Sequence, residues 1–119
     1  MKLTQSASEL VQQLKSKGIS AVELLEVHLD RISSINPDIN AVVTLDEDRA
    51  RERAMVADED LEKGADLGPL HGLPMTVKDA YEVAGIVTTG GSPKWKNHVP
   101  QVNAEVVDRL TAAGAIVFG

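Results

Sequence analysis

The sequence of 119 residues predicts an α/β fold: a mainly helical region at 1–66 precedes a β-α-β unit within 67–119. Two observations support this prediction. Apolar residues recur at helical spacing in the first region, and two short apolar runs flank a further helical pattern in the second. A strand-helix-strand unit pairs its strands in parallel inside a sheet that is covered on both faces. Because so few strands and helices cannot complete such a sheet, we expect a single incomplete domain.

Two helices are expected at the start of the chain. The first begins near Ser6 and ends near Gly18, because glycine is a common helix stop. In the second, Ser20 and Glu23 have the spacing of a capping box, and the Asn-Pro-Asp stretch at 36–38 is expected to stop the helix. The apolar residues of the two helices are Leu10, Val11, Leu14, Val22, Leu25, Leu29 and Ile32.

The next segments complete the helical region. Residues 41–45, AVVTL, predict a short strand or an extended loop. Asp46 is expected to cap a third helix that runs to Lys63, with Gly64 as its stop. The apolar side of this helix consists mostly of small residues, which permit a close neighbour: Ala50, Ala54, Ala57 and Leu61.

The second region is rich in glycine, proline and threonine as far as Asn103. Within it, Met75–Val77 predicts a buried strand that ends at Lys78. Asn103 is expected to cap the last helix, and Gly114 is expected to close it before a second strand at 115–118. The apolar residues of this helix are Val106, Val107, Leu110 and Ala113.

Composition excludes several classes of protein. The net charge is −6, the isoelectric point is near 4.9 and no basic patch occurs. Nucleic-acid binding is therefore not expected, because phosphate binding depends on clustered Lys and Arg. The absence of cysteine excludes disulfides and thiolate metal sites. No apolar run approaches the roughly 18 residues of a membrane span, and no signal peptide is evident. We expect a cytoplasmic protein without a membrane partner.

Several residues resemble functional motifs only in part. Gly85–Ser92 has the glycine spacing of a phosphate-binding loop, but Gly91 occupies the position of its lysine. Ser92 is outside a nucleophile elbow and is interpreted as a turn residue. The three histidines lack the spacing of a zinc site. We interpret His28 as a helix-surface residue; His71 either makes a structural hydrogen bond or lines a site.

Lys78 is the remaining candidate for chemistry. In one interpretation it ends a strand and reaches solvent along its own methylene groups. In the other, desolvation keeps the amine neutral, so that it can accept a proton from a hydroxyl. The residues around Lys78 leave both interpretations open.

Three stretches together closely resemble amidase signature enzymes: GPLHGLPMTVKD at 68–79, AGIVTTGGSP at 84–93 and VPQVNAEVVDRLTAAGAIVFG at 99–119. The upstream helices and INPDINAVV at 35–43 extend the similarity to nearly the whole chain. The resemblance implies that the chain is the amino-terminal part of a large α/β/α sandwich around a mixed sheet.

The resemblance also implies a mechanism. The family's catalysts are a serine nucleophile, a second serine in a cis peptide bond, and a lysine in a V-K-D motif that matches Lys78. Lys78 would then be the base that draws a proton from the nucleophile through the bridging serine. Both serines belong to a downstream Gly/Ser-rich segment that this chain lacks, so we expect the chain alone to be inactive. We expect Asp79 to hold its loop rather than to react.

The parent protein is expected to hydrolyse small carboxylic amides through an acyl-enzyme, without a metal or an organic cofactor. Two alternatives stay open. One is a glutaminase subunit of the same family, which releases ammonia from glutamine for misacylated tRNA and needs partner subunits. The other is a non-catalytic interaction module. In all three cases, the apolar surface left by truncation is expected to allow self-association.

Overall fold

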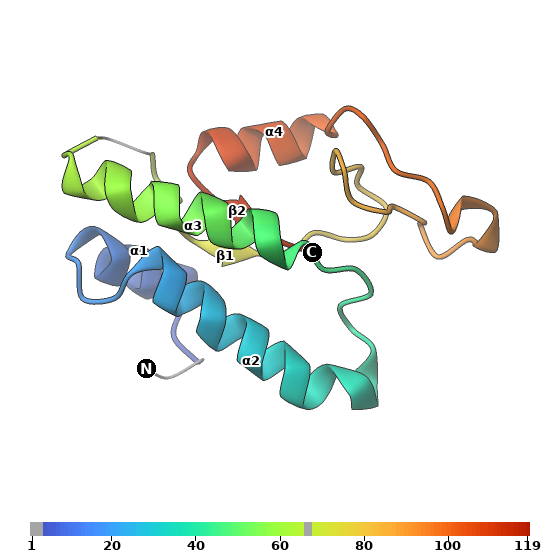
Figure 1. The fold of residues 1–119 in the computed structure, drawn as a ribbon, viewed down its shortest axis with the longest axis horizontal. Coiled ribbons are helices and arrows are strands. Elements are labelled where there is room, and N and C mark those ends of the chain that lie inside the picture. The colour runs from blue at the N-terminus through green and yellow to red at the C-terminus, as the bar shows by residue number, and fades with distance from the viewer. Residues whose placement is uncertain (1–3, 66–67) are drawn as a thin grey trace.

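The structure, a computed structural model, describes residues 4–65 and 68–119 and places helices on both faces of a two-stranded parallel sheet (Figure 1). The predicted α/β class is confirmed. The predicted boundary between residues 66 and 67 lies outside the described residues. In chain order the elements are α1 (Ala7–Lys15), α2 (Ala21–Ile39), α3 (Glu47–Glu62), β1 (Pro74–Met75), a 3₁₀ helix (Pro93–Trp95), α4 (Glu105–Ala112) and β2 (Ile116–Val117).

The sheet has the predicted β-α-β topology. β1 and β2 pair in parallel, with Pro74 opposite Ile116, and α4 lies between them in the chain. The pairing continues past the strand ends, because the N–H of Val77 donates to the carbonyl of Gly119 at 3.0 Å. β1 begins one residue earlier than predicted and is shorter. Lys78 therefore lies just beyond the end of the strand.

The two faces of the sheet bury different cores. Because strand side chains alternate, Ile116 and Phe118 pack with α1, α2 and α3, whereas Val117 packs with Val107 of α4. Val106, which was also expected on the buried side of α4, is 42% exposed. The buried residues of the larger core are Leu10, Leu14, Ala21, Leu24, Leu25, Leu29, Ala50, Ala54, Ala57, Leu73, Ile116 and Phe118.

Local capping starts both of the first two helices. The capping boxes of α1 and α2 are present, as the sequence indicates for α2. α2 has a second, tertiary cap, because the carboxylate of Asp58 on α3 accepts the N–H groups of Ala21 at 2.7 Å and Val22 at 3.2 Å. After α1, the residue with positive φ is Lys17, at 60°, so the expectation that Gly18 takes this role is wrong. Gly18 instead donates its N–H to Gln13 in the same turn, at 2.8 Å.

The prediction that the Asn-Pro-Asp stretch stops α2 is wrong. The helix continues through Pro37 to Ile39 and ends at Asn40, which has a φ of 48°. A proline in a helix removes one backbone hydrogen bond and crowds the preceding turn. The side chain of Asn36 steadies this turn by exchanging two hydrogen bonds with the backbone of Val42, at 2.8 and 2.9 Å.

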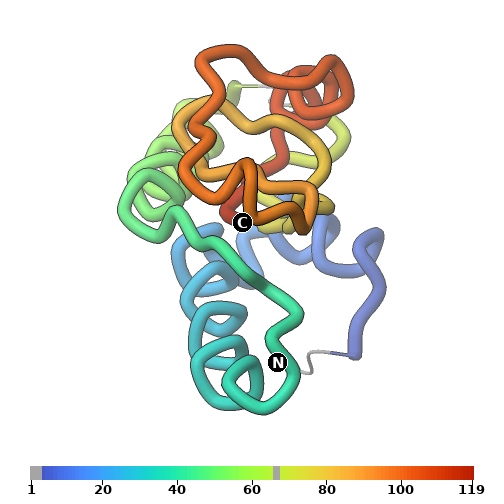
Figure 2. The backbone as a smooth tube through the Cα atoms, turned by 90° about the vertical axis from the view of Figure 1, so that its right-hand side faces the viewer, coloured from blue at the N-terminus to red at the C-terminus, as the bar shows by residue number. Residues whose placement is uncertain are grey.

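Residues 41–45 form an extended connector and no strand, which is the second of the two possibilities stated for them. Figure 2 shows this connector, in teal and green, running from the end of α2 back to α3 beside the last residues of the chain. The N–H of Asp46 donates to the carbonyl of Phe118 at 2.9 Å. The connector is thereby tied to the sheet by this backbone contact.

Two predicted side-chain helix caps are also wrong, because the two side chains have other partners. Asp46 precedes α3 but makes no side-chain cap; its carboxylate binds Arg49 and Arg53 instead. Asn103 accepts the N–H of Ala84 at 2.7 Å and donates to Asp108 at 2.9 Å. Gly64 and Gly114 follow α3 and α4 with positive φ, as expected of helix stops.

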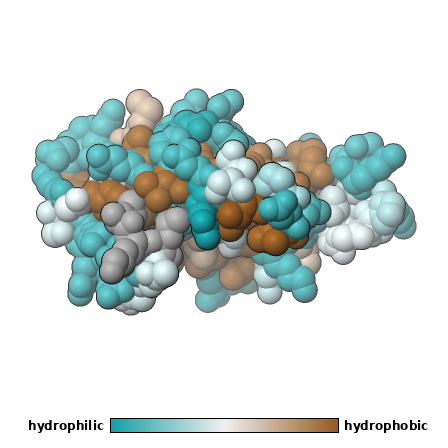
Figure 3. All heavy atoms as spheres, turned by 90° about the horizontal axis from the view of Figure 1, so that it is seen from below, coloured by the Kyte–Doolittle hydropathy of each residue, from teal (hydrophilic) through white to brown (hydrophobic). Residues whose placement is uncertain are grey.

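Large apolar side chains remain exposed after folding, among them Ile39, Val43, Met55, Val56 and Val102. In the view of Figure 3, apolar side chains gather along the middle of the molecule and hydrophilic ones surround them. Within the described ranges, no helix combines the length and hydropathy that a membrane span requires.

The tertiary cap gives a prediction about stability. Asp58→Ala leaves two N–H groups of α2 without their carboxylate, so the free energy of unfolding should fall by about 1–2 kcal/mol. Urea unfolding measures this value. The matched control is Asp30→Ala on the exposed side of α2, with an expected change within about 0.5 kcal/mol. Equal losses in the two variants would contradict the capping role.

Candidate active site

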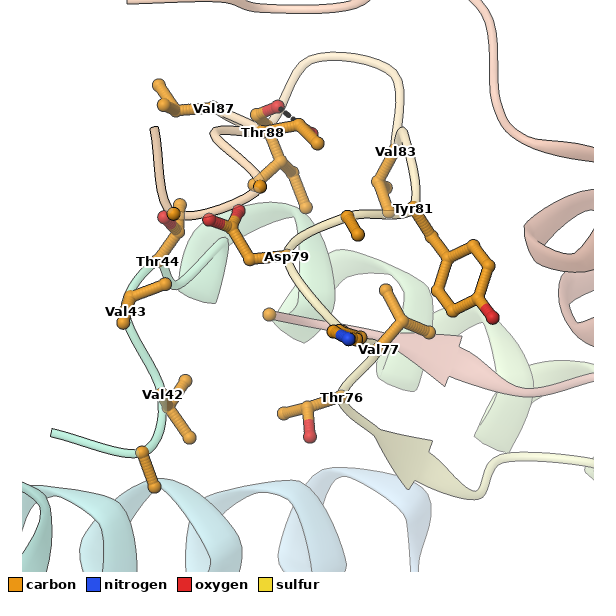
Figure 4. A pocket seen from close by; sticks show the side chains of 17 residues that line it. Val42, Val43, Thr44, Thr76, Val77, Asp79, Tyr81, Val83, Val87 and Thr88 are labelled. Carbon is orange, nitrogen blue, oxygen red and sulfur yellow. Dashed lines mark hydrogen bonds between the residues drawn. The ribbon is translucent and has the colours of Figure 1, made fainter. Parts of the chain in front are cut away.

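Lys78 lies on the wall of an open cavity of about 490 Å³ at the end of β1 (Figure 4). Three parts of the chain form this cavity: the connector at 41–44, the segment at 76–83 and the loop at 86–91, with Gly119 beside them. The cavity therefore lies outside the carboxyl ends of the parallel strands. Open α/β sheets bind their ligands at this position.

The cavity wall is mainly aliphatic. Figure 4 shows Val42 and Val43 on one side, Val77 on another, and Val87 and Thr88 above them. Three threonine hydroxyls and three ionisable side chains supply the polar groups. These lining residues are Thr44, Thr76, Thr88, Lys78, Asp79 and Tyr81.

The expectation of a sequestered lysine is not met within these 119 residues. Lys78 is exposed, because the cavity has walls on only some of its sides. Desolvation sufficient to neutralise an amine requires burial of that amine. Among the residues that the structure describes, no carboxylate forms an ion pair with Lys78. The structure thus offers a lysine at the wall of a partly built site.

The loop before β1 has a close fit to the end of α4, which fixes where β1 begins. Gly68 has a φ of 89°, and a Cβ atom there would lie 2.7 Å from the carbonyl oxygen of Ala113. The N–H groups of Leu70 and Gly72 donate to the carbonyls of Ala113 and Gly114 at 2.8 and 2.9 Å. Glycine is required at Gly68 by both the left-handed backbone and this close approach.

Asp79 fixes the loop at 86–91, which forms part of the cavity wall, in agreement with the role expected from the sequence. Its carboxylate accepts a hydrogen bond from the hydroxyl of Thr89 and another from the N–H of Thr89 at 3.2 Å. Its carbonyl accepts the N–H of Gly90 at 2.8 Å. Sequence reasoning missed Thr89, because nothing in the local pattern singles out one threonine of the Thr-Thr-Gly-Gly stretch. The available signal was Asp79, an acid directly after the candidate base Lys78, whose partner the sequence does not reveal.

The other residues considered from the sequence lie elsewhere. His71 is 2% exposed and lines a second cavity of about 520 Å³, on the α3 and α4 side of the loop. Among the described residues its Nδ1 has no hydrogen-bond partner, so the expected structural hydrogen bond is missing from that atom. His28 is half-buried on α2, with its Nδ1 2.8 Å from the carbonyl of Leu24. Ser92 is in a turn, where its N–H donates to Thr89 at 3.0 Å.

The described residues also bear on metal and phosphate binding. Within 4–65 and 68–119, no three His, Asp or Glu side chains are grouped in a way that could hold an ion. The glycines at 90 and 91 have positive φ and are followed by the three-residue 3₁₀ helix Pro93–Trp95, not by the α-helix that follows the glycines of a phosphate-binding loop.

Fold and cavity define an α/β protein with a lysine at the carboxyl end of its parallel strands. The sequence model of the Amidase family matches residues 23–119. The chain belongs to the amidase signature family.

Its relatives are enzymes of about four times this length. Over 114 residues the chain is 40% identical to the A-type subunit of the glutamyl-tRNA(Gln) amidotransferase of Carboxydothermus hydrogenoformans and 38% identical to an acylamidase of Rhodococcus erythropolis. Each match covers 96% of this chain and 24% of the relative. A bacterial aryl acylamidase structure of the amidase signature family superposes with a TM-score of 0.89 at 30% identity, over 97% of this chain and 24% of that one. The chain therefore spans about a quarter of the length of these relatives.

The buried histidine gives a prediction about pH. Burial lowers the pKa of His71, so the unfolded chain binds a proton at this residue at a higher pH than the folded chain does. Stability is then fully present above the unfolded value of about 6.5 and falls as the pH decreases below it. In urea titrations between about pH 7.5 and about pH 5.5, the unfolding midpoint should fall less in His71→Gln than in wild type. The control His28→Gln retains His71 and should follow the wild type; identical slopes in all three proteins would refute this assignment.

Proposed function

We propose that this chain supplies the lysine of a cytoplasmic amide hydrolase that acts through a serine, cis-serine and lysine triad. The observation that carries the proposal is the position of Lys78, on the wall of an open cavity at the carboxyl end of the parallel strands. Membership of the amidase signature family supports amide hydrolysis. Both serines would come from polypeptide outside these 119 residues.

The proposed chemistry is a two-step acyl transfer. The lone pair of the Lys78 amine accepts a proton from the bridging serine, which takes one from the nucleophilic serine. The nucleophile's oxygen bonds to the carbonyl carbon of the amide, and the carbon–nitrogen bond breaks as the leaving amine takes a proton. Water then attacks the ester of the acyl-enzyme, releases the carboxylic acid and restores the serine. No redox change or further reactant is needed.

The open side of the cavity fits this proposal. Lys78 is exposed in this chain, whereas a general base must be neutral to accept a proton. We expect the remaining three quarters of the family's length to cover the cavity and remove water from the amine. The aliphatic side chains of Val42, Val43 and Val77 would then form part of the wall of a dry site.

A second candidate is hydrolysis of the glutamine side-chain amide within an amidotransferase. The 40% identity to the amidotransferase subunit of Carboxydothermus hydrogenoformans favours it. Both candidates use the same lysine and the same bond cleavage. They differ in the substrate and in the need for partner subunits.

Substitution of Lys78 tests the proposal directly. In the full-length protein that contains these residues, Lys78→Ala should lower kcat/KM for amide hydrolysis by about 10²–10⁴-fold, because the general base is removed. Release of ammonia or of an aryl amine measures the rate. The matched control is Lys94→Ala, an exposed lysine on the 3₁₀ helix outside the cavity, which should retain wild-type activity. Full activity in Lys78→Ala, or a protein that binds a partner and never hydrolyses an amide, would refute the enzyme proposal.

The two substrate classes are separated by a second measurement. If the protein is a free-standing amidase, the purified single chain should hydrolyse aryl or aliphatic amides without any other polypeptide. If it is the glutaminase of an amidotransferase, hydrolysis of glutamine should rise when partner subunits that copurify with it are present. Hydrolysis of neither class under either condition would count against both candidates.

A further inference from the structure

We propose that Thr89 is a positioning residue that keeps the carboxylate of Asp79 away from Lys78, so that the amine is not held in its protonated form by a neighbouring acid. This inference rests on the proposed function of Lys78 as a base. It concerns a different contact, the one between Thr89 and Asp79, and it is tested by the pH dependence of activity.

The contacts around Asp79 show how the carboxylate is held. Lys78 and Asp79 are adjacent in the chain and line the same cavity. Thr89 occupies both oxygens of the carboxylate: its N–H donates to Oδ1 at 3.2 Å, and its hydroxyl donates to Oδ2. In Figure 4 the carboxylate of Asp79 is turned toward the loop that carries Thr88. Among the described residues, Lys78 has no ion-pair partner, although an acid is its direct neighbour.

Thr89 itself is fixed in place. Its hydroxyl also accepts the N–H of Gly91 at 3.1 Å, and the N–H of Gly90 donates to the carbonyl of Asp79 at 2.8 Å. Both glycines have positive φ, at 56° and 76°, so the loop folds back over Asp79. Asp79 and Thr89 are both half-buried. Hydrogen bonds to a half-buried carboxylate stabilise its ionised form in this orientation. The carboxylate therefore turns less readily toward an exposed amine.

Other charges near the cavity do not offer Lys78 a partner. Asp79 and Tyr81 are the ionisable groups that line the cavity with it. Two acids on neighbouring segments have other partners: Asp46 forms ion pairs with Arg49 and Arg53, and a carboxylate oxygen of Glu82 lies 2.7 Å from Nε2 of His98. Asp79 is therefore the carboxylate that decides whether the lysine has a counterion within the cavity.

A carboxylate beside the lysine would oppose its role as a base. A negative charge within about 4–6 Å favours the protonated amine, and a protonated amine accepts no proton. The Thr89 hydroxyl holds the carboxylate charge of Asp79 away from the lysine, while Asp79 still anchors the loop. The threonine thus acts on the reaction through Asp79 and makes no contact with the reacting atoms.

The test is the pH profile of kcat/KM for an amide substrate in the full-length protein. Activity requires the neutral amine, so it rises through the acidic limb of the profile. Thr89→Val removes the hydroxyl and leaves the carboxylate only the N–H of residue 89, so the carboxylate can turn toward Lys78 and the limb should move to higher pH by about one unit. Well below the limb, kcat/KM then falls about tenfold, and at high pH it approaches the wild-type value. Thr89→Ser restores a hydroxyl and should return the limb to its original pH.

A double substitution identifies the carboxylate as the cause. In Thr89→Val with Asp79→Asn, no charge is left to approach the lysine, so the acidic limb should not move upward. The inference is overturned if Thr89→Val lowers kcat/KM equally at every pH, or if the upward shift persists in the double variant. These outcomes differ from failure of the proposed function, in which Lys78→Ala retains activity and no lysine-dependent limb exists.

Discussion

The parallel pairing of β1 with β2 is the constraint on which the rest of the structure depends. Its register directs Ile116 and Phe118 to the helices α1 to α3 and Val117 to α4, so a single two-residue strand divides the protein into two cores. The same pairing carries the chain onward to Lys78, because Val77 still bonds to Gly119. Without this register neither core nor cavity would be in place, since a one-residue slip exchanges the two faces of a strand.

Much of this architecture follows from local sequence. Ser20 with Glu23, and the short apolar run of the last strand, depend on neighbours a few positions away, and the structure agrees with both. Gly64 and Gly114 end their helices because a left-handed residue there costs glycine little. The position of Lys78 after the first strand was likewise visible in the sequence. Features whose energy comes from residues within one turn or one strand could therefore be predicted.

The failed predictions share a physical cause, which is a side-chain partner beyond the helical turn that the local rule considers. Asp46 and Asn103 have the residue type of a helix cap, but Arg53 and Ala84 offer their side chains other hydrogen bonds. Pro37 was expected to end α2, yet Asn36 holds the following turn through Val42. The site shows the same limit. The residue type of Lys78 was informative. Its exposure depends on which segments of the chain surround the cavity, and the local sequence does not show this.

Lys78, which we propose as the base, lies in an acidic chain. The net charge is −6, but exposed charges farther away than about 8–10 Å are largely screened by salt. What matters is therefore the nearest acids. Asp46 forms ion pairs with Arg49 and Arg53, Glu82 is hydrogen-bonded to His98, and Asp79 is bound to the Thr89 loop. Among the described residues Lys78 thus has no ion-pair partner, so the covering polypeptide that we propose would have to remove only water, not an ion pair, from the amine.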